Sequence, residues 1–268
     1  MSECNILGER DRTARLFGQI AIHAGRAIMK ARETRHHPTT KSDGSPVTAA
    51  DLAADEVIRD SLARHLPGLP VITEETWTAA SCAEAACYVL VDPLDGTREF
   101  IKGSDEFTVN IALIADHVPV AGAVYAPALR RLYIGGTSAH RLDLAGDEQD
   151  QHLDGLRPIG VRQAPQAGWR AVVSRSHLDA DTRRWIEAHR IAELCSAGSS
   201  LKFCTVAEGE ADVYPRLGPT MEWDTAAGHA VLLAAGGRVT DLGGRPMRYG
   251  KTAFRNGSFI AWGTAGID

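Results

Sequence analysis

The pattern of hydrophobic positions predicts a first half made of helices packed on an antiparallel-rich sheet. Apolar side chains recur at every third or fourth position over residues 12–32, which is the spacing of an amphipathic helix. A second helix is expected to follow Thr48. Residues 107–115 and 118–125 are rich in β-branched side chains and are expected to form a hairpin, with further short strands over 130–143.

The second half of the chain shows a different pattern, in which short apolar runs alternate with helical periods. The stretch from Gly146 to Pro158 is the most polar of the chain and carries no apolar period. We therefore expect an N-terminal half over 1–150 and a C-terminal half over 151–268. The alternation beyond the boundary is typical of α/β units. The elements expected there are strands at 169–173, 191–194, 211–214 and 237–241, and helices near 179–189, 199–208 and 224–235.

Composition and charge narrow the class of protein. With 268 residues and 44% hydrophobic content, the chain can bury a sizeable core. The net charge of −5 and the absence of a basic stripe argue against binding to a nucleic-acid polymer. No apolar run approaches the roughly 18 residues that span a bilayer, and the first residues do not read as a signal peptide. The five cysteines lack metal-ligand spacing and are expected to be reduced thiols. We therefore expect a cytoplasmic protein. Peripheral association with a membrane stays open.

The most informative motif is Asp92-Pro-Leu-Asp-Gly-Thr97, which sets two carboxylates directly behind an apolar run. Pro93 disfavours a helix at its predecessor, so Asp92 and Asp95 are expected to cluster on a turn at the end of a strand. Carboxylates and a backbone carbonyl without His or Cys favour Mg²⁺ or Mn²⁺ over zinc. The N–H groups of Gly96 and Thr97 can face an anion. Taken alone, the motif could also be only a polar turn.

Three further acids follow other predicted elements, and each has a structural interpretation beside the functional one. Glu74 comes just after a short apolar segment, as Asp92 does. Asp224 heads an Ala-rich helix and could be only a first-turn acid, although the preceding residues 221–223 would make an unusual exposed cap. Asp51 completes the capping-box pattern that begins at Thr48.

Four long segments of the sequence resemble the Li⁺-sensitive, Mg²⁺-dependent phosphatases of the inositol monophosphatase superfamily. Within it the closest resemblance is to the CysQ-type 3′(2′),5′-bisphosphate nucleotidases. The resemblance implies an α/β/α/β/α layered sandwich with the active site between the halves. It also implies hydrolysis of adenosine 3′,5′-bisphosphate, and of 3′-phosphoadenylyl sulfate, in sulfur metabolism. The segments run from Asp92 to Lys102 and on through Glu106 to Leu113, from Val172 to His177, from Gly198 to Cys204, and from Tyr214 to His229.

Carried over to this sequence, the resemblance implies a set of metal ligands and catalytic groups. Two or three Mg²⁺ ions, for which Mn²⁺ can substitute, would be bound, and Asp92 would bridge two of them. Thr97, hydrogen-bonded to Asp51, would with Glu74 orient and deprotonate the attacking water. The implied metal ligands are Glu74, Asp92, the Leu94 carbonyl, Asp95 and Asp224. The reacting phosphate would meet the N–H groups of Gly96 and Thr97 and lie against Leu94, Asp95 and Asp224.

The resemblance assigns specificity to the second half of the chain. His177, Ser199, Lys202 and Arg216 would contact the nucleotide and the phosphate that is not cleaved. The residue types suit this role, because Arg offers a planar fork to phosphate oxygens and Lys a point charge. Lys202 could instead be a solvated helix side chain and His177 a neighbour of a helix cap, and the role of Lys41 is open.

Alternatives to the leading function also stay open. The same metals would serve an inositol or sugar monophosphatase, and a chain of another class would be a nucleotide-binding sensor. The expected partner is a small nucleotide bisphosphate, and the chain is expected to be a monomer or a homodimer.

Overall fold

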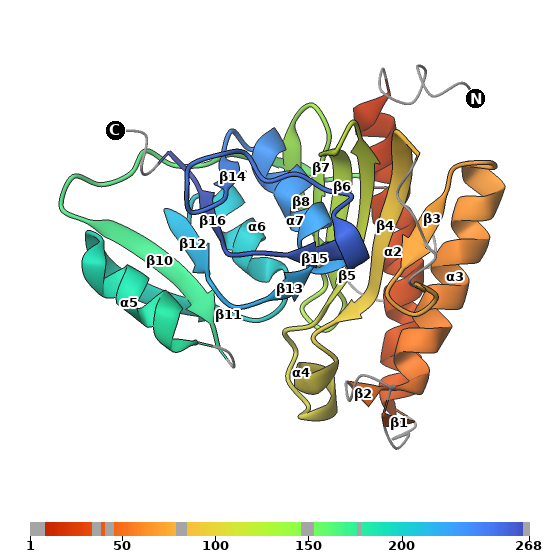
Figure 1. Cartoon of the computed structure of the whole chain (residues 1–268). Helices are drawn as coiled ribbons and strands as arrows, with labels where there is room; N and C mark the ends of the chain where they lie inside the picture. The colour runs from red at the N-terminus through yellow and green to blue at the C-terminus, as the bar shows by residue number, and fades with distance from the viewer. Residues whose placement is uncertain are drawn as a thin grey trace.

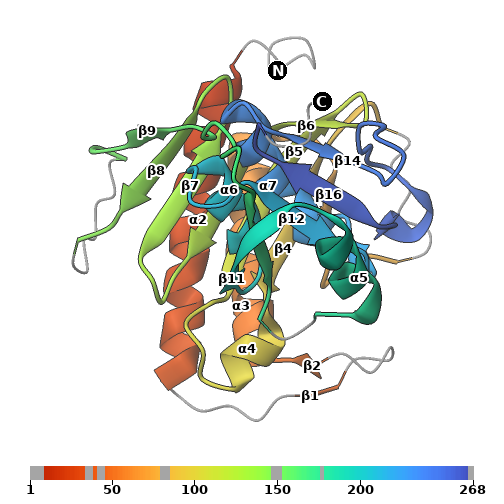
Figure 2. The same cartoon turned by 90° about the vertical axis from the view of Figure 1, so that its left-hand side faces the viewer.

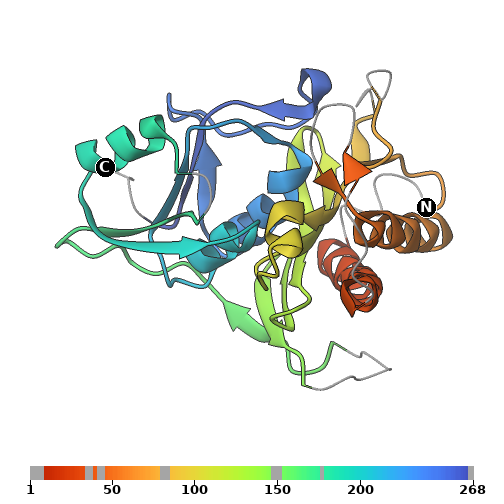
Figure 3. The same ribbon diagram turned by 90° about the horizontal axis from the view of Figure 1, so that it is seen from below.

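The computed structural model describes residues 9–33, 39–40, 46–78, 85–145, 153–175 and 178–264. In it, helices and two sheets alternate as five layers (Figure 1). Seen from below, α2 and α3 cover one side of the larger sheet and α5 lies at the opposite side of the molecule (Figure 3). The predicted α/β/α/β/α sandwich is confirmed.

The outer helical layer is formed by α2 (Arg10–Glu33) and α3 (Ala49–His65), as the apolar period predicts. Thr48 begins α3 as a capping box, in which its hydroxyl accepts from the backbone of the first turn and the Asp51 carboxylate accepts from the backbone N–H of Thr48. Both helices bury their apolar faces against the larger sheet. Asp51 is therefore a structural cap, whatever else it does.

The larger sheet has the strand order β3-β4-β5-β6-β7-β8-β9. The pair β3–β4 is parallel and the other neighbours are antiparallel, which agrees with the expectation of an antiparallel-rich sheet. Both faces are covered: Val89 and Val91 of β4 pack against the outer helices, whereas Tyr88 and Leu90 face α7. The strands are β3 (Val71–Thr73), β4 (Cys87–Asp95), β5 (Thr108–Ala115), β6 (Val118–Ala126), β7 (Arg131–Gly135), β8 (Ala139–Asp143) and β9 (Arg157–Ile159).

The second half adds a central helical layer, a smaller sheet and an outer helix. Helices α6 (Leu201–Ala207) and α7 (Trp223–Ala234) lie between the sheets, and α5 (Ala180–Ala188) covers the outer face of the smaller sheet, on the side that faces the viewer in Figure 2. The smaller sheet has the order β11-β10-β12-β16-β14. Its strands are β10 (Trp169–Ser174), β11 (Ile191–Ala197), β12 (Val213–Arg216), β14 (Arg238–Thr240) and β16 (Phe259–Trp262).

Short elements complete the described chain. They are α4 (Thr97–Ile101), the pairs β1 (Thr39–Thr40) with β2 (Pro46–Val47) and β13 (Thr220–Met221) with β15 (Arg255–Asn256), and the 3₁₀ turn η1 (Thr252–Phe254). None of the helices in the described ranges combines the length and the apolar character needed to cross a bilayer. Cys87, Cys195 and Cys204 are free thiols, as expected; Cys4 and Cys82 lie outside the described residues.

One expectation from the sequence needs correction. The Asp92 motif does not begin a turn: β4 continues through Pro93 to Asp95, with an irregular register against β5 that accommodates the proline. The segment 221–223, which would make an unusual exposed cap, is indeed not one, because Glu222 has no exposed surface. Strand β9 lies beyond residue 150 and still pairs with β8 of the first sheet, and the division at that residue stays a prediction.

Candidate active site

A cavity of about 280 Å³ opens between the two halves of the molecule and collects most of the predicted site residues. Its walls come from the end of β4 and the start of α4 on one side, and from α6, β12 and the first turn of α7 on the other. The predicted residues that line it are Glu74, Asp92, Leu94, Asp95, Gly96, Thr97, Ser199, Lys202, Arg216 and Asp224. His177 and Lys41 lie outside the described residues.

The end of β4 presents its acids through an irregular piece of sheet. Asp92 pairs with Asn110 and Asp95 with Thr108, so three steps along β4 oppose two along β5. Inside this bulge the backbone N–H of Leu94 donates to Asp92 Oδ1 at 3.1 Å. The bulge turns successive side chains toward the same cavity, which a regular strand with its period of two would not do.

Burial and mutual repulsion both raise the pKa values of carboxylates in the cavity. Burial, reinforced by the charges of Glu74, Asp95 and Asp224, raises the pKa of Asp92 well above its usual value. Burial, with Asp95 next, does the same to the pKa of Asp224. Such mutual repulsion is relieved by a cation, and clustered carboxylate oxygens are the donors that Mg²⁺ prefers.

The donor chemistry therefore fits a hard divalent cation, although the side chains are not drawn together around one. Within the described ranges, no three acidic, histidine or cysteine side chains stand in an arrangement that could hold a metal ion. The predicted ligand set consequently stays a prediction.

Thr97 and Asp51 are brought together from distant parts of the sequence. The Thr97 hydroxyl donates to Asp51 Oδ1 at 3.0 Å and lies 3.2 Å from the Leu94 carbonyl oxygen. The other carboxylate oxygen of Asp51 accepts from the N–H and the hydroxyl of Thr48, at 2.7 and 2.6 Å. Burial is the largest influence on Asp51 and raises its pKa. The capping residue of α3 is thus also the partner of the predicted catalytic hydroxyl.

Gly96 and Ser199 lie in close contact across the two halves. Ser199 has a positive φ of 48° and its hydroxyl donates to the Asp95 carbonyl at 2.6 Å. A Cβ at residue 96 would lie 2.5 Å from that hydroxyl oxygen, and Gly96 itself has a φ of 94°. Only glycine meets both conditions. The Ser199 hydroxyl, predicted to meet the nucleotide, is engaged with the β4 backbone in this structure.

Two residues that the sequence did not single out connect the acids of the two halves. Ser200 Oγ lies 2.6 Å from the carbonyl oxygen of Asp224 and 3.3 Å from Asp95 Oδ2. Asn110 Nδ2 donates to Ser200 Oγ at 2.9 Å and lies 3.4 Å from the same Asp95 oxygen. Asn110 and Ser200 are each only 1% exposed. A lone amide inside the apolar strand Thr108–Ala115 was the signal that could have identified Asn110.

A second link between the halves lies at the rim of the cavity and was also missed. Glu106 accepts from the Gly198 N–H at 2.9 Å and forms an ion pair with Arg175 at 3.0 Å. Arg175 lines the cavity beside Ser199. This contact fixes the chain that leads into α6.

Two cationic side chains of the second half, Lys202 and Arg216, line the cavity together with the acids. Lys202 is 94% buried, with its ammonium group 5.4 Å from the Tyr214 ring centroid and donating to the Ser199 carbonyl. Burial lowers its pKa to about 8, against the opposing effect of Asp95. Arg216 is half-buried at the end of β12 and donates to the Pro219 carbonyl at 3.2 Å. Carboxylates and cationic side chains thus line the same cavity.

Comparisons with known proteins identify the family of the chain. The model of the inositol monophosphatase family matches residues 10–264. The 3′(2′),5′-bisphosphate nucleotidase CysQ of Escherichia coli is 44% identical over 236 residues, which are 86% of this chain and 91% of that protein. The crystal structure of CysQ from Bacteroides thetaiotaomicron superposes with a TM-score of 0.81 at 40% identity, covering 94% of this chain and 97% of that one. The inositol monophosphatase from Anabaena gives a TM-score of 0.73 at 25% identity, covering 95% of this chain and 92% of that one. The resemblance seen in the sequence is therefore confirmed, and the chain belongs to the inositol monophosphatase family.

Proposed function

We propose that the chain is a metal-dependent 3′(2′),5′-bisphosphate nucleotidase that releases the 3′-phosphate of adenosine 3′,5′-bisphosphate and leaves AMP. The observation that carries the proposal is that one cavity is lined both by the carboxylates of Asp92, Asp95 and Asp224 and by the cationic side chains of Lys202 and Arg216. A substrate with two phosphates could meet a metal ion held by the carboxylates with one phosphate and the cationic side chains with the other. Relatives up to 44% identical are 3′(2′),5′-bisphosphate nucleotidases, which supports the same substrate class. As a nucleotide that also carries a 3′-phosphate, 3′-phosphoadenylyl sulfate would be a second substrate.

The acids would hold the metal ions, and Thr97, Asp51 and Glu74 would orient and deprotonate the attacking water. Two or three Mg²⁺ ions, held by Glu74, Asp92, the Leu94 carbonyl, Asp95 and Asp224, would supply the Lewis acid that neutralises charge on the phosphoryl group and on the leaving oxygen.

Because the Thr97 hydroxyl donates to Asp51, its lone pairs are left to accept a proton from the attacking water. Asp51, with its raised pKa, is suited to share that proton. The Glu74 carboxylate would accept a hydrogen bond from the other hydrogen of the water. The N–H groups of Gly96 and Thr97, where β4 gives way to α4, would hold the phosphate under attack.

The second phosphate would be recognised by Lys202 and Arg216, with His177 as a further predicted contact. Arg216 can place its planar fork against two phosphate oxygens, whereas Lys202 contributes a point charge. Ser199 would act by holding the loop before α6 against β4, and its contact with the nucleotide stays a prediction.

A phosphate-release panel tests the proposal directly. The purified protein is assayed on adenosine 3′,5′-bisphosphate, 5′-AMP and inositol 1-phosphate, with and without Mg²⁺, at equal enzyme concentration. We expect Mg²⁺-dependent release from the bisphosphate at the highest kcat/KM, with AMP as product. Faster cleavage of inositol 1-phosphate would identify an inositol monophosphatase instead, and nucleotide binding without turnover would identify a sensor.

A variant of one of the two cationic side chains tests the specificity part of the proposal. Arg216→Ala should lower kcat/KM for the bisphosphate by about tenfold to a few hundredfold, the size of a lost charge-assisted contact of about 1.5–3 kcal/mol. The matched control is Arg190→Ala, which changes an exposed arginine away from the cavity. It should leave kcat/KM unchanged for the bisphosphate and for a small monophosphate. Equal losses on the bisphosphate and on a small monophosphate would show that Arg216 does not recognise the second phosphate.

A further inference from the structure

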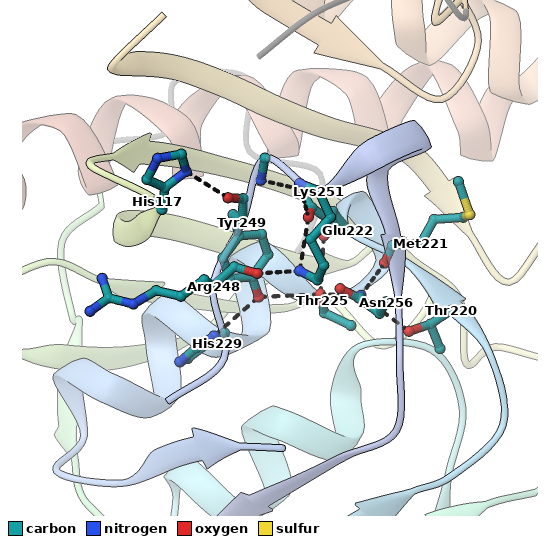
Figure 4. Close-up of polar contacts among 11 residues, drawn as sticks. His117, Thr220, Met221, Glu222, Thr225, His229, Arg248, Tyr249, Lys251 and Asn256 are labelled. Carbon is teal, nitrogen blue, oxygen red and sulfur yellow. Dashed lines mark hydrogen bonds and ion pairs between the residues drawn. The ribbon is translucent and has the colours of Figure 1, made fainter. Parts of the chain in front are cut away.

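The segment Tyr249–Asn256 packs against the first turn of α7, where Asp224 lies, yet it contributes none of the predicted metal ligands. Figure 4 shows its polar contacts. Glu222, which immediately precedes α7, is fully buried, and its carboxylate accepts from the N–H groups of Gly250 and Lys251 at 2.8 and 2.9 Å. The Lys251 ammonium pairs with the same carboxylate at 2.8 Å, and the Glu222 N–H donates to the Phe254 carbonyl at 2.7 Å. The segment is thus attached at several points to the residue two positions before Asp224.

Asn256 links the segment to the Asp224 carboxylate through Met221. Its amide nitrogen donates to the Met221 carbonyl at 2.8 Å and lies within 3.2 Å of the Thr220 and Thr225 hydroxyls (Figure 4). Met221 in turn donates its N–H to Asp224 Oδ2 at 2.8 Å. Asn256 is 3% exposed, and it pairs with Thr220 in the short β13–β15 ladder. One side chain therefore holds the residue, Met221, whose N–H orients a predicted metal ligand.

The same segment also contacts the loop that carries Glu74. Trp77, three residues after Glu74, lies 5.9 Å from Trp223 and 6.4 Å from Phe254 between ring centroids. Trp223 and Phe254 are themselves 6.1 Å apart. These three rings come from three separate parts of the chain and close into one cluster. The predicted ligand Glu74 precedes Trp77 by three residues, and the predicted ligand Asp224 directly follows Trp223. Both tryptophan rings pack against Phe254.

Tyr249 ties the beginning of the segment to both halves as well. Its hydroxyl lies 3.2 Å from Thr225 Oγ1 and 3.1 Å from His229 Nδ1, both on α7. Its backbone N–H donates to the His117 carbonyl at 3.0 Å, and its carbonyl lies 2.8 Å from His117 Nδ1, at the β5–β6 hairpin. Buried polar groups that are satisfied in this way hold a single arrangement.

We propose that the segment Tyr249–Asn256 is a positioning element that sets the metal affinity of the site, and that Asn256 is the positioning residue through which it orients Asp224. This inference rests on the proposed metal-dependent function. Partners that orient a metal ligand typically change metal affinity by about 10- to 100-fold when they are removed. Because Asn256 does not line the cavity, its loss should act on metal binding rather than on the chemical step.

The test measures metal binding in the substrate-free protein. Mn²⁺ binding is followed by electron paramagnetic resonance, and the Mg²⁺ concentration for half-maximal turnover is measured beside kcat at saturating Mg²⁺. Asn256→Ala should raise the Kd for Mn²⁺ and the half-saturating Mg²⁺ concentration by about 10- to 100-fold, while kcat at saturation stays within about threefold of the wild type.

Ser258→Ala is the matched control, because it also removes a bond from a side chain to a backbone carbonyl, that of Leu217, without touching the chain of contacts to Asp224. It should leave the Kd for Mn²⁺ unchanged. If Asn256→Ala does not fold by circular dichroism, Lys251→Met takes its place, since Lys251 is one-third exposed and its loss loosens the Glu222 contact.

An unchanged Kd for Mn²⁺ in the folded Asn256 variant, or in its Lys251 replacement, overturns the proposal, as does an equal loss in Ser258→Ala. A wild-type protein that binds no Mn²⁺ would instead contradict the proposed function itself.

Discussion

Replacing Thr97 by valine isolates the hydroxyl that the structure places beside Asp51. Valine keeps the branched shape and the backbone N–H but removes the 3.0 Å bond to Asp51 Oδ1. Asp51 keeps its two bonds from Thr48, so the cap of α3 survives. Losing one hydrogen bond to a buried carboxylate costs about 1–3 kcal/mol of unfolding free energy, which a domain stable by about 5–15 kcal/mol tolerates. The loss of a positioned proton acceptor should lower kcat by about 10²- to 10⁴-fold.

The assay compares steady-state phosphate release from adenosine 3′,5′-bisphosphate at saturating Mg²⁺ for wild type, Thr97→Val and Thr97→Ser. Urea denaturation, followed by fluorescence, reports the free energy of unfolding of each. Serine retains the hydroxyl and should keep kcat within about tenfold of the wild type, whereas KM should change little in either variant because the backbone N–H remains. A Thr97→Val protein with nearly wild-type kcat would refute the assignment of Thr97 and Asp51 to the attacking water.

Further outcomes follow from other parts of the site. Asp92→Asn should nearly abolish turnover without unfolding the protein, because it removes an anionic ligand from a site whose affinity depends on ligand charge; activity at high Mg²⁺ would contradict this. Excess chelator should stop phosphate release, Mg²⁺ should restore it, and Ca²⁺ should compete without supporting turnover, as measured in the same assay. The pKa of Lys202 is lowered by burial to about 8, so its charge is present below that pH and lost above it. The kcat/KM for the bisphosphate should therefore fall above about pH 8, and Lys202→Gln should remove that limb of the pH profile. Gly96→Ala should destabilise the fold by about 1–3 kcal/mol in thermal denaturation, because of its positive φ and the nearby Ser199 hydroxyl.

Much of the architecture could be predicted from the sequence because it depends on local periodicity. The apolar spacing over 12–32 predicted α2, and the β-branched runs around Asp116 predicted the β5–β6 hairpin almost to the residue. The alternation after residue 168 predicted most elements of the second half. Strand β16 (Phe259–Trp262) was not predicted. The family was recognisable from long motifs, and so were the acids that line the cavity.

The relations between those acids were decided only by the tertiary structure. Asp51 and Thr97 are 46 residues apart, and Ser200 reaches across 105 residues to Asp95, so no local pattern could pair them. Glu222 is buried because a segment almost 30 residues later folds over it, and no local pattern could have identified that segment as its partner. Local sequence determines which residues can form a helix, a strand or a ligand, since those properties depend on neighbours along the chain. Which carboxylates share a cavity, and which amides orient them, depends on how the two sheets and the helices between them pack.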